Sequence, residues 1–130
     1  MSERPRPAPA FSVAARARSF RYALRGIAAV LRTQHNAWIH AAASAAAVAL
    51  GIAVGLSRAE WCLVVLAIVA VWTAEALNTA FEALCDVASP GLHPLVERAK
   101  DIAAGAVLIA AVGAAVVGLL VFVPHLRVTA

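Results

Sequence analysis

The chain has 130 residues, of which 63% are hydrophobic and 14% charged, and its formal net charge is +4. A water-soluble domain of this length has too little interior to bury so much apolar surface, which argues against a soluble protein and for one partly solvated by lipid. Seven of the eleven basic residues fall at or before Arg32, ahead of the first long apolar run. This placement is typical of membrane topology signals, and we expect no nucleic-acid partner.

The N-terminal part divides into a tail and a helix. Residues 1–10 are proline-rich and polar, and we expect a disordered tail before a single domain over residues 11–130. The tail lacks the apolar core of a cleaved signal peptide, so we expect it to be retained. From Phe11 to Thr33, apolar side chains recur every three or four residues while arginines occupy another face. This pattern predicts a basic amphipathic helix at the membrane surface, with packing against protein as the alternative.

Three apolar segments follow, each about long enough to cross the hydrocarbon core of a bilayer. We expect the spans at about residues 36–57, 60–87 and 94–123. In the first span, Gly51 and Gly55 have the small-xxx-small spacing of close helix contacts. Pro124 is expected to end the third span, because proline has no backbone N–H. The chain is therefore predicted to be an all-α membrane protein with one surface helix and three transmembrane helices.

Basic residues set the predicted orientation of these spans. The arginines before the first span, together with Arg98 and Lys100 before the third, are expected to face the cytoplasm. Arg58 and Arg127 then lie on the outer side. We therefore expect a multi-pass protein of the cell's inner (plasma) membrane with a cytoplasmic N-terminus.

A polar stripe marks the cytoplasmic end of the second span. At about 100° per residue, Glu75, Asn78, Glu82 and Asp86 fall within about 80° of one another and share one helix face. A carboxylate near membrane depth costs a few kcal/mol unless it is paired or hydrated, so the stripe predicts a functional site. The alternative is a set of salt bridges that pins two helices together, for example Lys100 to Asp86.

The residue types of the stripe suit phosphoryl chemistry. Carboxylates bind Mg²⁺ together with substrate phosphates, Arg98 and Lys100 can bind nucleotide phosphate, and a further carboxylate can accept a proton from an alcohol. Phosphate-binding loop and dinucleotide motifs are missing from the sequence. His35 and His40 do not share a helix face, and we interpret them as interfacial polar residues rather than zinc ligands.

The segment AEALNTAFEALCD, followed by HPLVERAKDIAAGAVLIA, resembles the signature of the prokaryotic diacylglycerol kinases and undecaprenol kinases. The resemblance extends from about Ser19 to Pro124. It implies a homotrimer with active sites between subunits, which transfers the γ-phosphoryl group of ATP, with Mg²⁺, to a membrane lipid. The implied acceptor is diacylglycerol, with undecaprenol as the alternative. A non-catalytic helical scaffold is the alternative of another class.

The same resemblance implies roles for individual residues. Glu75 matches the general base toward the lipid hydroxyl, and Asn78 belongs to the same catalytic cluster. Glu82 matches a glutamate that binds Mg²⁺ and contacts the nucleotide. The other positions implied to contact the nucleotide are Tyr22, Gly91, Leu92, His93, Lys100 and Asp101.

The sequence departs from the family pattern at Gln34. Many members have a metal-binding glutamate just before the first span, at the position of this glutamine. A glutamine offers a neutral oxygen without a charge. We therefore expect weaker Mg²⁺ binding at Gln34, replacement by another acid such as Asp86, or a changed activity.

Overall fold

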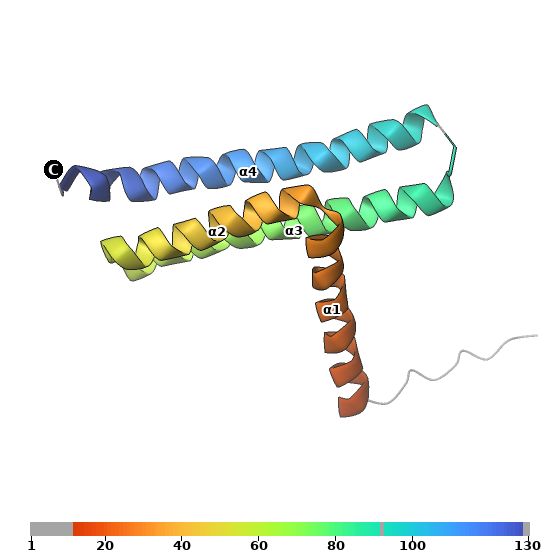
Figure 1. Cartoon of the computed structure of the whole chain (residues 1–130), viewed down its shortest axis with the longest axis horizontal. Helices are drawn as coiled ribbons and strands as arrows, with labels where there is room; N and C mark the ends of the chain where they lie inside the picture. The colour runs from red at the N-terminus through yellow and green to blue at the C-terminus, as the bar shows by residue number, and fades with distance from the viewer. Residues whose placement is uncertain (1–11, 92, 129–130) are drawn as a thin grey trace, which may run out of the picture.

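The structure is a computed structural model that describes residues 12–91 and 93–128. These residues form four helices, α1 (Val13–Thr33), α2 (His35–Val54), α3 (Arg58–Ala88) and α4 (Pro94–Val128). Figure 1 shows α2, α3 and α4 lying alongside one another, while α1 projects away from them at the start of α2. Each of α2, α3 and α4 is long and apolar enough to cross a membrane. The predicted all-α architecture is confirmed, and the expected tail lies outside the described residues.

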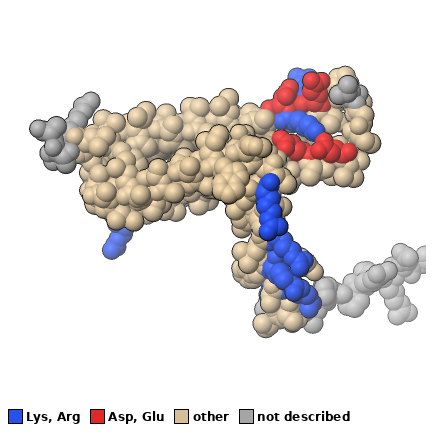
Figure 2. All heavy atoms as spheres, in the orientation of Figure 1, with Lys and Arg blue, Asp and Glu red and all other residues tan. Residues whose placement is uncertain are grey.

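Helix α1 is amphipathic and leaves its apolar face uncovered by the rest of the chain. Ser12 caps the helix, because its hydroxyl accepts the N–H of Ala15 at 3.3 Å. Phe20, Leu24 and Ile27 are all more than half exposed, whereas basic side chains line another side (Figure 2). An apolar helix face is stable only when it is buried against something, and the headgroup region of a bilayer offers such a surface.

Gly51 and Gly55, the two glycines with small-xxx-small spacing, have different roles near the connection between α2 and α3. A Cβ atom on Gly51 would lie 2.9 Å from side-chain atoms of both Leu56 and Trp61, so this glycine permits close packing. Gly55 has nothing near its Cβ position and instead adopts φ 70°, the left-handed conformation that ends α2. The close contact expected from the spacing is therefore made by Gly51, while Gly55 is a helix cap.

Helix α3 begins with a capping box that the sequence analysis did not use. The hydroxyl of Ser57 faces the N–H of Glu60, whose carboxylate accepts the N–H of Ser57 at 2.8 Å. The other Glu60 oxygen lies 2.8 Å from Nε2 of His125 on α4. The start of α3 is thereby tied to the far end of α4, which helps to set the register of these two neighbouring helices.

The expectation that Pro124 ends the third apolar helix is wrong. Helix α4 continues through Pro124 to Val128. Proline has a φ angle compatible with a helix, and its cost is one missing hydrogen bond together with a clash with the preceding turn. Close to the end of a long apolar helix this penalty does not stop the last turn from forming.

The interior of the chain is thin for its length. Leu56, Val64 and Val121 form the buried cluster near the α2–α3 connection. Many large apolar side chains are exposed instead, including Leu77 at 67% and Ile109 at 75%. Such surfaces are stable when lipid or another subunit covers them, as the composition predicts.

Candidate active site

Glu75 is the most deeply buried acidic group among the described residues. Its exposed fraction is 1%, and that of Asn78, almost one helical turn later on α3, is 7%. Oε1 of Glu75 and Oδ1 of Asn78 are buried and have no hydrogen-bond partner among the described residues. A buried polar atom without a partner is costly, and such atoms are common where a substrate completes the hydrogen bonding.

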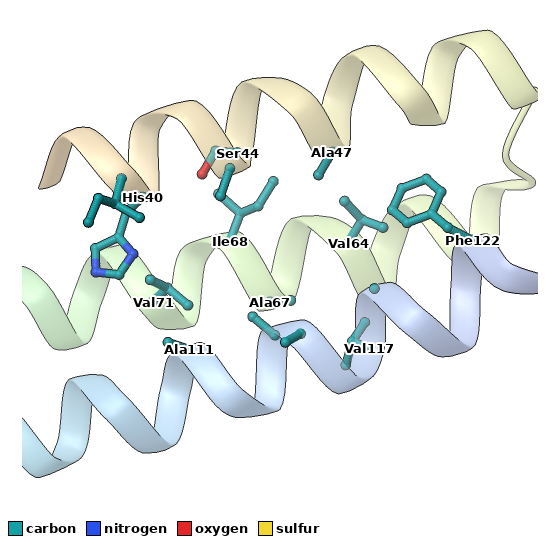
Figure 3. Close-up of a pocket in the computed structure, with 15 residues that line it drawn as sticks. His40, Ser44, Ala47, Val64, Ala67, Ile68, Val71, Ala111, Val117 and Phe122 are labelled. Atoms are coloured by element: carbon teal, nitrogen blue, oxygen red, sulfur yellow. The ribbon is translucent and has the colours of Figure 1, made fainter. Parts of the chain in front are cut away.

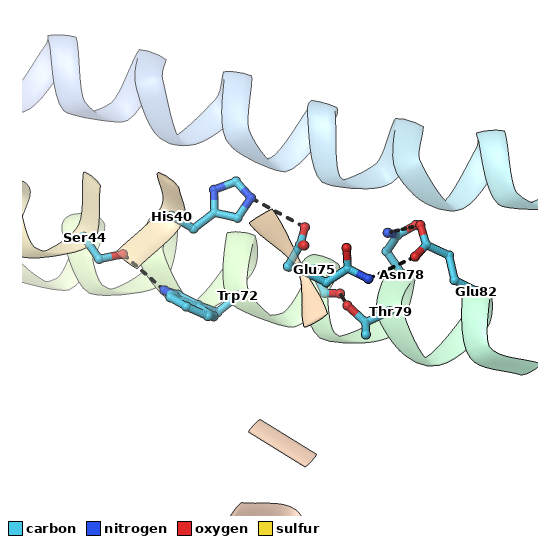
Figure 4. A network of polar contacts seen from close by, with 8 residues as sticks. His40, Ser44, Trp72, Glu75, Asn78, Thr79 and Glu82 are labelled. Atoms are coloured by element: carbon cyan, nitrogen blue, oxygen red, sulfur yellow. Dashed lines mark hydrogen bonds and ion pairs between the residues drawn. The ribbon is translucent and has the colours of Figure 1, made fainter. Parts of the chain in front are cut away.

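The polar stripe forms a connected network around Glu82. Asn78 donates its amide to Oε1 of Glu82 at 3.0 Å, and Gln34 donates its amide to Oε2 at 3.0 Å. Figure 4 shows Glu75, Asn78 and Glu82 following one another along α3. Gln34 reaches this face because it lies at the extended break between α1 and α2. The structure therefore brings together the predicted residues Gln34, Glu75, Asn78 and Glu82.

The side chains of Glu82, Asn78 and Gln34 suit Mg²⁺ only if the ion has further oxygen ligands from a substrate. Within residues 12–91 and 93–128, no group of three or more His, Cys, Asp or Glu side chains converges on a metal position. Glu82 supplies one carboxylate, and the Asn78 and Gln34 amides beside it can each present an oxygen after rotation of the amide. One or two carboxylates plus substrate phosphates are the usual protein environment of Mg²⁺. Glu82 with these amides thus suits Mg²⁺ bound to a nucleotide.

His40, which the sequence led us to interpret as an interfacial polar residue, lies beside Glu75. Nε2 of His40 on α2 is 3.5 Å from Oε2 of Glu75, and the two side chains are 13% and 1% exposed. The His40 ring meets Trp72 edge-on, and Trp72 donates its indole N–H to the Ser44 hydroxyl at 3.1 Å (Figure 4). The available signal was the occurrence of an ionisable residue inside an alanine-rich span, which marks a functional position by default.

Charged residues gather where α3 meets α4, at one end of the molecule (Figure 2). Lys100 on α4 forms an ion pair and hydrogen bond with Asp86 on α3. The salt bridge anticipated as an alternative is therefore present, beside the Glu82 network rather than in place of it. Asp101 and Arg98 are exposed on the same turn region of α4.

Among the described residues, no recorded hydrogen bond joins Glu82 to the predicted nucleotide-contacting residues Tyr22, Gly91 or His93. Tyr22 is 57% exposed, and its ring faces the Arg25 guanidinium at 5.9 Å. It precedes Gln34 by a distance of roughly 18 Å along the helix, at 1.5 Å per residue. His93 accepts the N–H of Leu95 at 3.2 Å, Gly91 accepts a bond from Ser89, and Leu92 lies outside the described residues.

An apolar cavity opens next to this network. It has a volume of about 320 Å³ and lies between α2, α3 and α4. Figure 3 shows His40 at one end and Phe122 toward the other, with Ala67 and Ile68 between them. Because His40 lines the cavity and also contacts Glu75, an apolar chain placed in the cavity would end beside the buried carboxylate.

Comparison with known proteins finds relatives over most of the chain. A sequence model of the family described as prokaryotic diacylglycerol kinase matches residues 21–122. An undecaprenol kinase of Bacillus subtilis is 44% identical over 109 residues, which are 84% of this chain and 89% of that enzyme. A diacylglycerol kinase of Synechocystis sp. is 37% identical over 109 residues, which are 83% of this chain and 62% of that enzyme. The family match includes every residue of the polar network, from Gln34 to Lys100.

Proposed function

Because the chain belongs to the prokaryotic diacylglycerol kinase family and is a lipid kinase, we propose that it transfers the γ-phosphoryl group of ATP to a lipid hydroxyl held at Glu75. The observation that carries this proposal is the buried Oε1 of Glu75, on a membrane-spanning helix, which has no hydrogen-bond partner among the described residues. A carboxylate without a hydrogen-bond donor at one oxygen is ready to accept the proton of an alcohol.

In the proposed transfer step, one bond forms and one bond breaks at the γ-phosphorus. The hydroxyl oxygen of the lipid forms a bond to the γ-phosphorus, the bond from that phosphorus to the bridging oxygen breaks, and ADP leaves. The hydroxyl proton passes to Oε1 of Glu75 and later to solvent. Asn78 supports the geometry, because its amide holds Glu82 at 3.0 Å and fixes the adjacent turn of α3.

The nucleotide is proposed to bind at Glu82. Bound Mg²⁺ supplies charge neutralisation for the phosphates during transfer. Glu82 would hold it through a carboxylate oxygen, and Gln34 would contribute at most a neutral oxygen. Lys100 lies at the same end of the bundle and is proposed to face the phosphates. Asp101, Gly91, Leu92 and His93, which are close to Lys100 in sequence, are proposed to contact the nucleotide.

The acceptor is proposed to be a lipid alcohol with a long apolar chain. The cavity that ends at His40 supports this class, because its lining is mostly alanine and branched aliphatic side chains. One of the two relatives is named for undecaprenol and the other for diacylglycerol, and the identity to the former is higher, 44% against 37%. The proposal therefore covers both lipids, and direct comparison separates them.

Assembly and placement in the cell complete the proposal. Tyr22 lies on α1, away from Glu82 of the same chain, so a nucleotide site that uses both residues needs a second subunit. The uncovered apolar face of α1 also leaves room for such a contact. We propose a homotrimer in the inner (plasma) membrane, with the sites on the cytoplasmic side, where the basic residues gather.

The test uses the full chain in mixed micelles with MgATP. Diacylglycerol and undecaprenol are supplied separately, and phosphorylated lipid is measured over time. Phosphorylation of at least one lipid is the expected result, and the faster of the two identifies the acceptor. A non-catalytic scaffold would phosphorylate neither lipid, and MgATP would not raise its unfolding temperature as binding to a folded protein does.

A further inference from the structure

We infer that His40 is a positioning residue for Glu75, which holds one carboxylate oxygen so that the other faces the lipid hydroxyl. The inference rests on the proposed role of Glu75 as the proton acceptor. The two oxygens of Glu75 have different surroundings: Oε2 lies 3.5 Å from Nε2 of His40, which makes no hydrogen bond of its own among the described residues, whereas no ion-pair or hydrogen-bond partner of Oε1 is recorded among them. If His40 fixes Oε2, the orientation of the whole carboxylate is set, and the lone pairs of Oε1 then point in one defined direction.

Burial gives this contact its importance. Glu75 is 1% exposed and His40 13%, so water competes weakly for either group. The separation of 3.5 Å is longer than an ordinary N–H···O hydrogen bond. Catalytic contacts are often long before substrates bind and shorten in the reacting complex. With a proton on Nε2, the His40 ring would donate to Oε2 of Glu75 once this contact shortens.

Trp72 and Ser44 keep the His40 ring in place. Ser44 follows His40 by about one helical turn on α2, and Trp72 precedes Glu75 by almost one turn on α3. The indole N–H of Trp72 is bonded to Ser44 at 3.1 Å, and the His40 ring lies edge-on to Trp72 with centroids 6.4 Å apart. Helices α2 and α3 are thus joined at two successive turns. The Trp72–Ser44 hydrogen bond supports the neighbouring His40–Glu75 contact.

Other groups near Glu75 do not replace His40 in this role. Thr79 donates its hydroxyl to the backbone carbonyl of Glu75 at 2.8 Å, not to the carboxylate. Lys100 is paired with Asp86. Among the described residues, His40 is the group recorded at ion-pair distance from the Glu75 carboxylate. An ionisable residue inside a membrane span is a functional candidate together with its partner.

The test compares variants that separate donor, volume and charge. His40→Leu keeps the approximate volume and removes the donor, whereas His40→Gln keeps an N–H close to the position of Nε2. Loss of a group that orients a metal ligand typically lowers activity by ~10–100-fold, and we expect a loss of the same size for a group that orients a catalytic carboxylate. We expect that loss in kcat for His40→Leu, recovery of most of it in His40→Gln, and an unchanged KM for ATP in both. His35→Leu, at an exposed position near the start of the same helix, is the matched control.

A cycle with Glu75→Gln distinguishes positioning from packing. If His40 acts through Glu75, His40→Leu should cause no further loss of kcat in the Glu75→Gln protein, because groups that act as a unit are strongly non-additive. An equal loss in both backgrounds contradicts the inference, as does wild-type kcat in His40→Leu. Should His40→Leu fail to fold, His40→Gln is compared with the shorter His40→Asn, and equal rates overturn the inference. Inactivity of the wild-type chain toward both lipids would instead refute the proposed function.

Discussion

Gln34 donates its side-chain amide to Glu82 across 3.0 Å and so joins the break between α1 and α2 to the polar face of α3. At this position the neutral amide stabilises the Glu82 carboxylate without any cation. A second acid here would instead place two like charges in direct contact. The glutamine therefore lets the network form without a contact between two like charges.

Gln34→Glu should make the protein depend more steeply on Mg²⁺. Two carboxylates at hydrogen-bonding distance repel each other unless a cation lies between them. Without Mg²⁺ we expect a lower unfolding temperature than in the wild type, and with MgATP we expect half-maximal activity at a lower Mg²⁺ concentration. Titration of activity and thermal unfolding against Mg²⁺ measures both effects.

The control for that prediction is His35→Glu, which adds the same charge at the adjacent exposed position. It should leave the Mg²⁺ dependence of activity unchanged. Identical Mg²⁺ curves for Gln34→Glu and the wild type would show that Gln34 does not face the metal.

Substitutions of Lys100 and of Asp86 should have different effects on the KM for ATP. Their ion pair is partly open to solvent, with side chains 36% and 68% exposed, and exposed pairs contribute roughly 0–1 kcal/mol to stability. Lys100→Met should therefore unfold near the wild-type temperature but raise the KM for ATP by about tenfold or more, which corresponds to about 1.4 kcal/mol.

Asp86→Asn is the matched variant, because it breaks the same ion pair and leaves Lys100 free. We expect its KM for ATP to stay within a few-fold of the wild type. A nucleotide role for Lys100 is contradicted if both variants change the KM equally, since the ion pair itself would then be the relevant feature.

Filling the apolar cavity should weaken use of the lipid. Ala67 lines it between His40 and Phe122 (Figure 3), and Ala67→Leu adds volume where an acyl or prenyl chain is proposed to lie. We expect a higher KM for the lipid with an unchanged KM for ATP, and overpacking that costs ~1–3 kcal/mol of stability at most. Ala46→Leu, at an exposed position outside the cavity, should change neither constant; equal lipid KM values in the two variants would remove the cavity from the acceptor site.

Gly51→Ala should destabilise the turn between α2 and α3. Its new Cβ would meet atoms of Leu56 and Trp61 at 2.9 Å, and forced repacking of this kind costs ~1–3 kcal/mol. Gly113→Ala on α4 is the control, because its Cβ position has open space. The unfolding temperature in one detergent should fall only for Gly51→Ala, and equal values for the two variants would contradict the close packing seen here.

The sequence was sufficient for the helices and for the polar face of α3. Apolar run lengths predicted the three spans to within a few residues, and the 100° helical step placed Glu75, Asn78 and Glu82 on one face. These are local properties, which periodicity records directly. The end of α4 was predicted wrongly, since a proline close to a helix end is tolerated when the surrounding turns are stable.

Contacts between different helices could not be predicted from the periodicity of the sequence. The His40–Glu75 and Gln34–Glu82 contacts join residues far apart in the chain, and their existence depends on how α2 packs on α3. The separation of Tyr22 from Glu82 likewise follows from the direction of α1, which a single helix pattern does not reveal. The capping box at Ser57 and Glu60, by contrast, lies within one turn and was readable locally, from its S-x-x-E spacing.

The most direct test of the account is the initial rate of lipid phosphorylation by Glu75→Gln, compared with Glu60→Gln and the wild type in the same micelles. Glu60 lies at the opposite end of α3, where it caps the helix and pairs with His125. We predict that Glu75→Gln lowers kcat by at least ~100-fold, within the range typical of a lost general base, while MgATP still raises its unfolding temperature. Glu60→Gln should keep a kcat near that of the wild type. A Glu75→Gln protein that phosphorylates the lipid at the wild-type rate would contradict the assignment of proton transfer to this carboxylate.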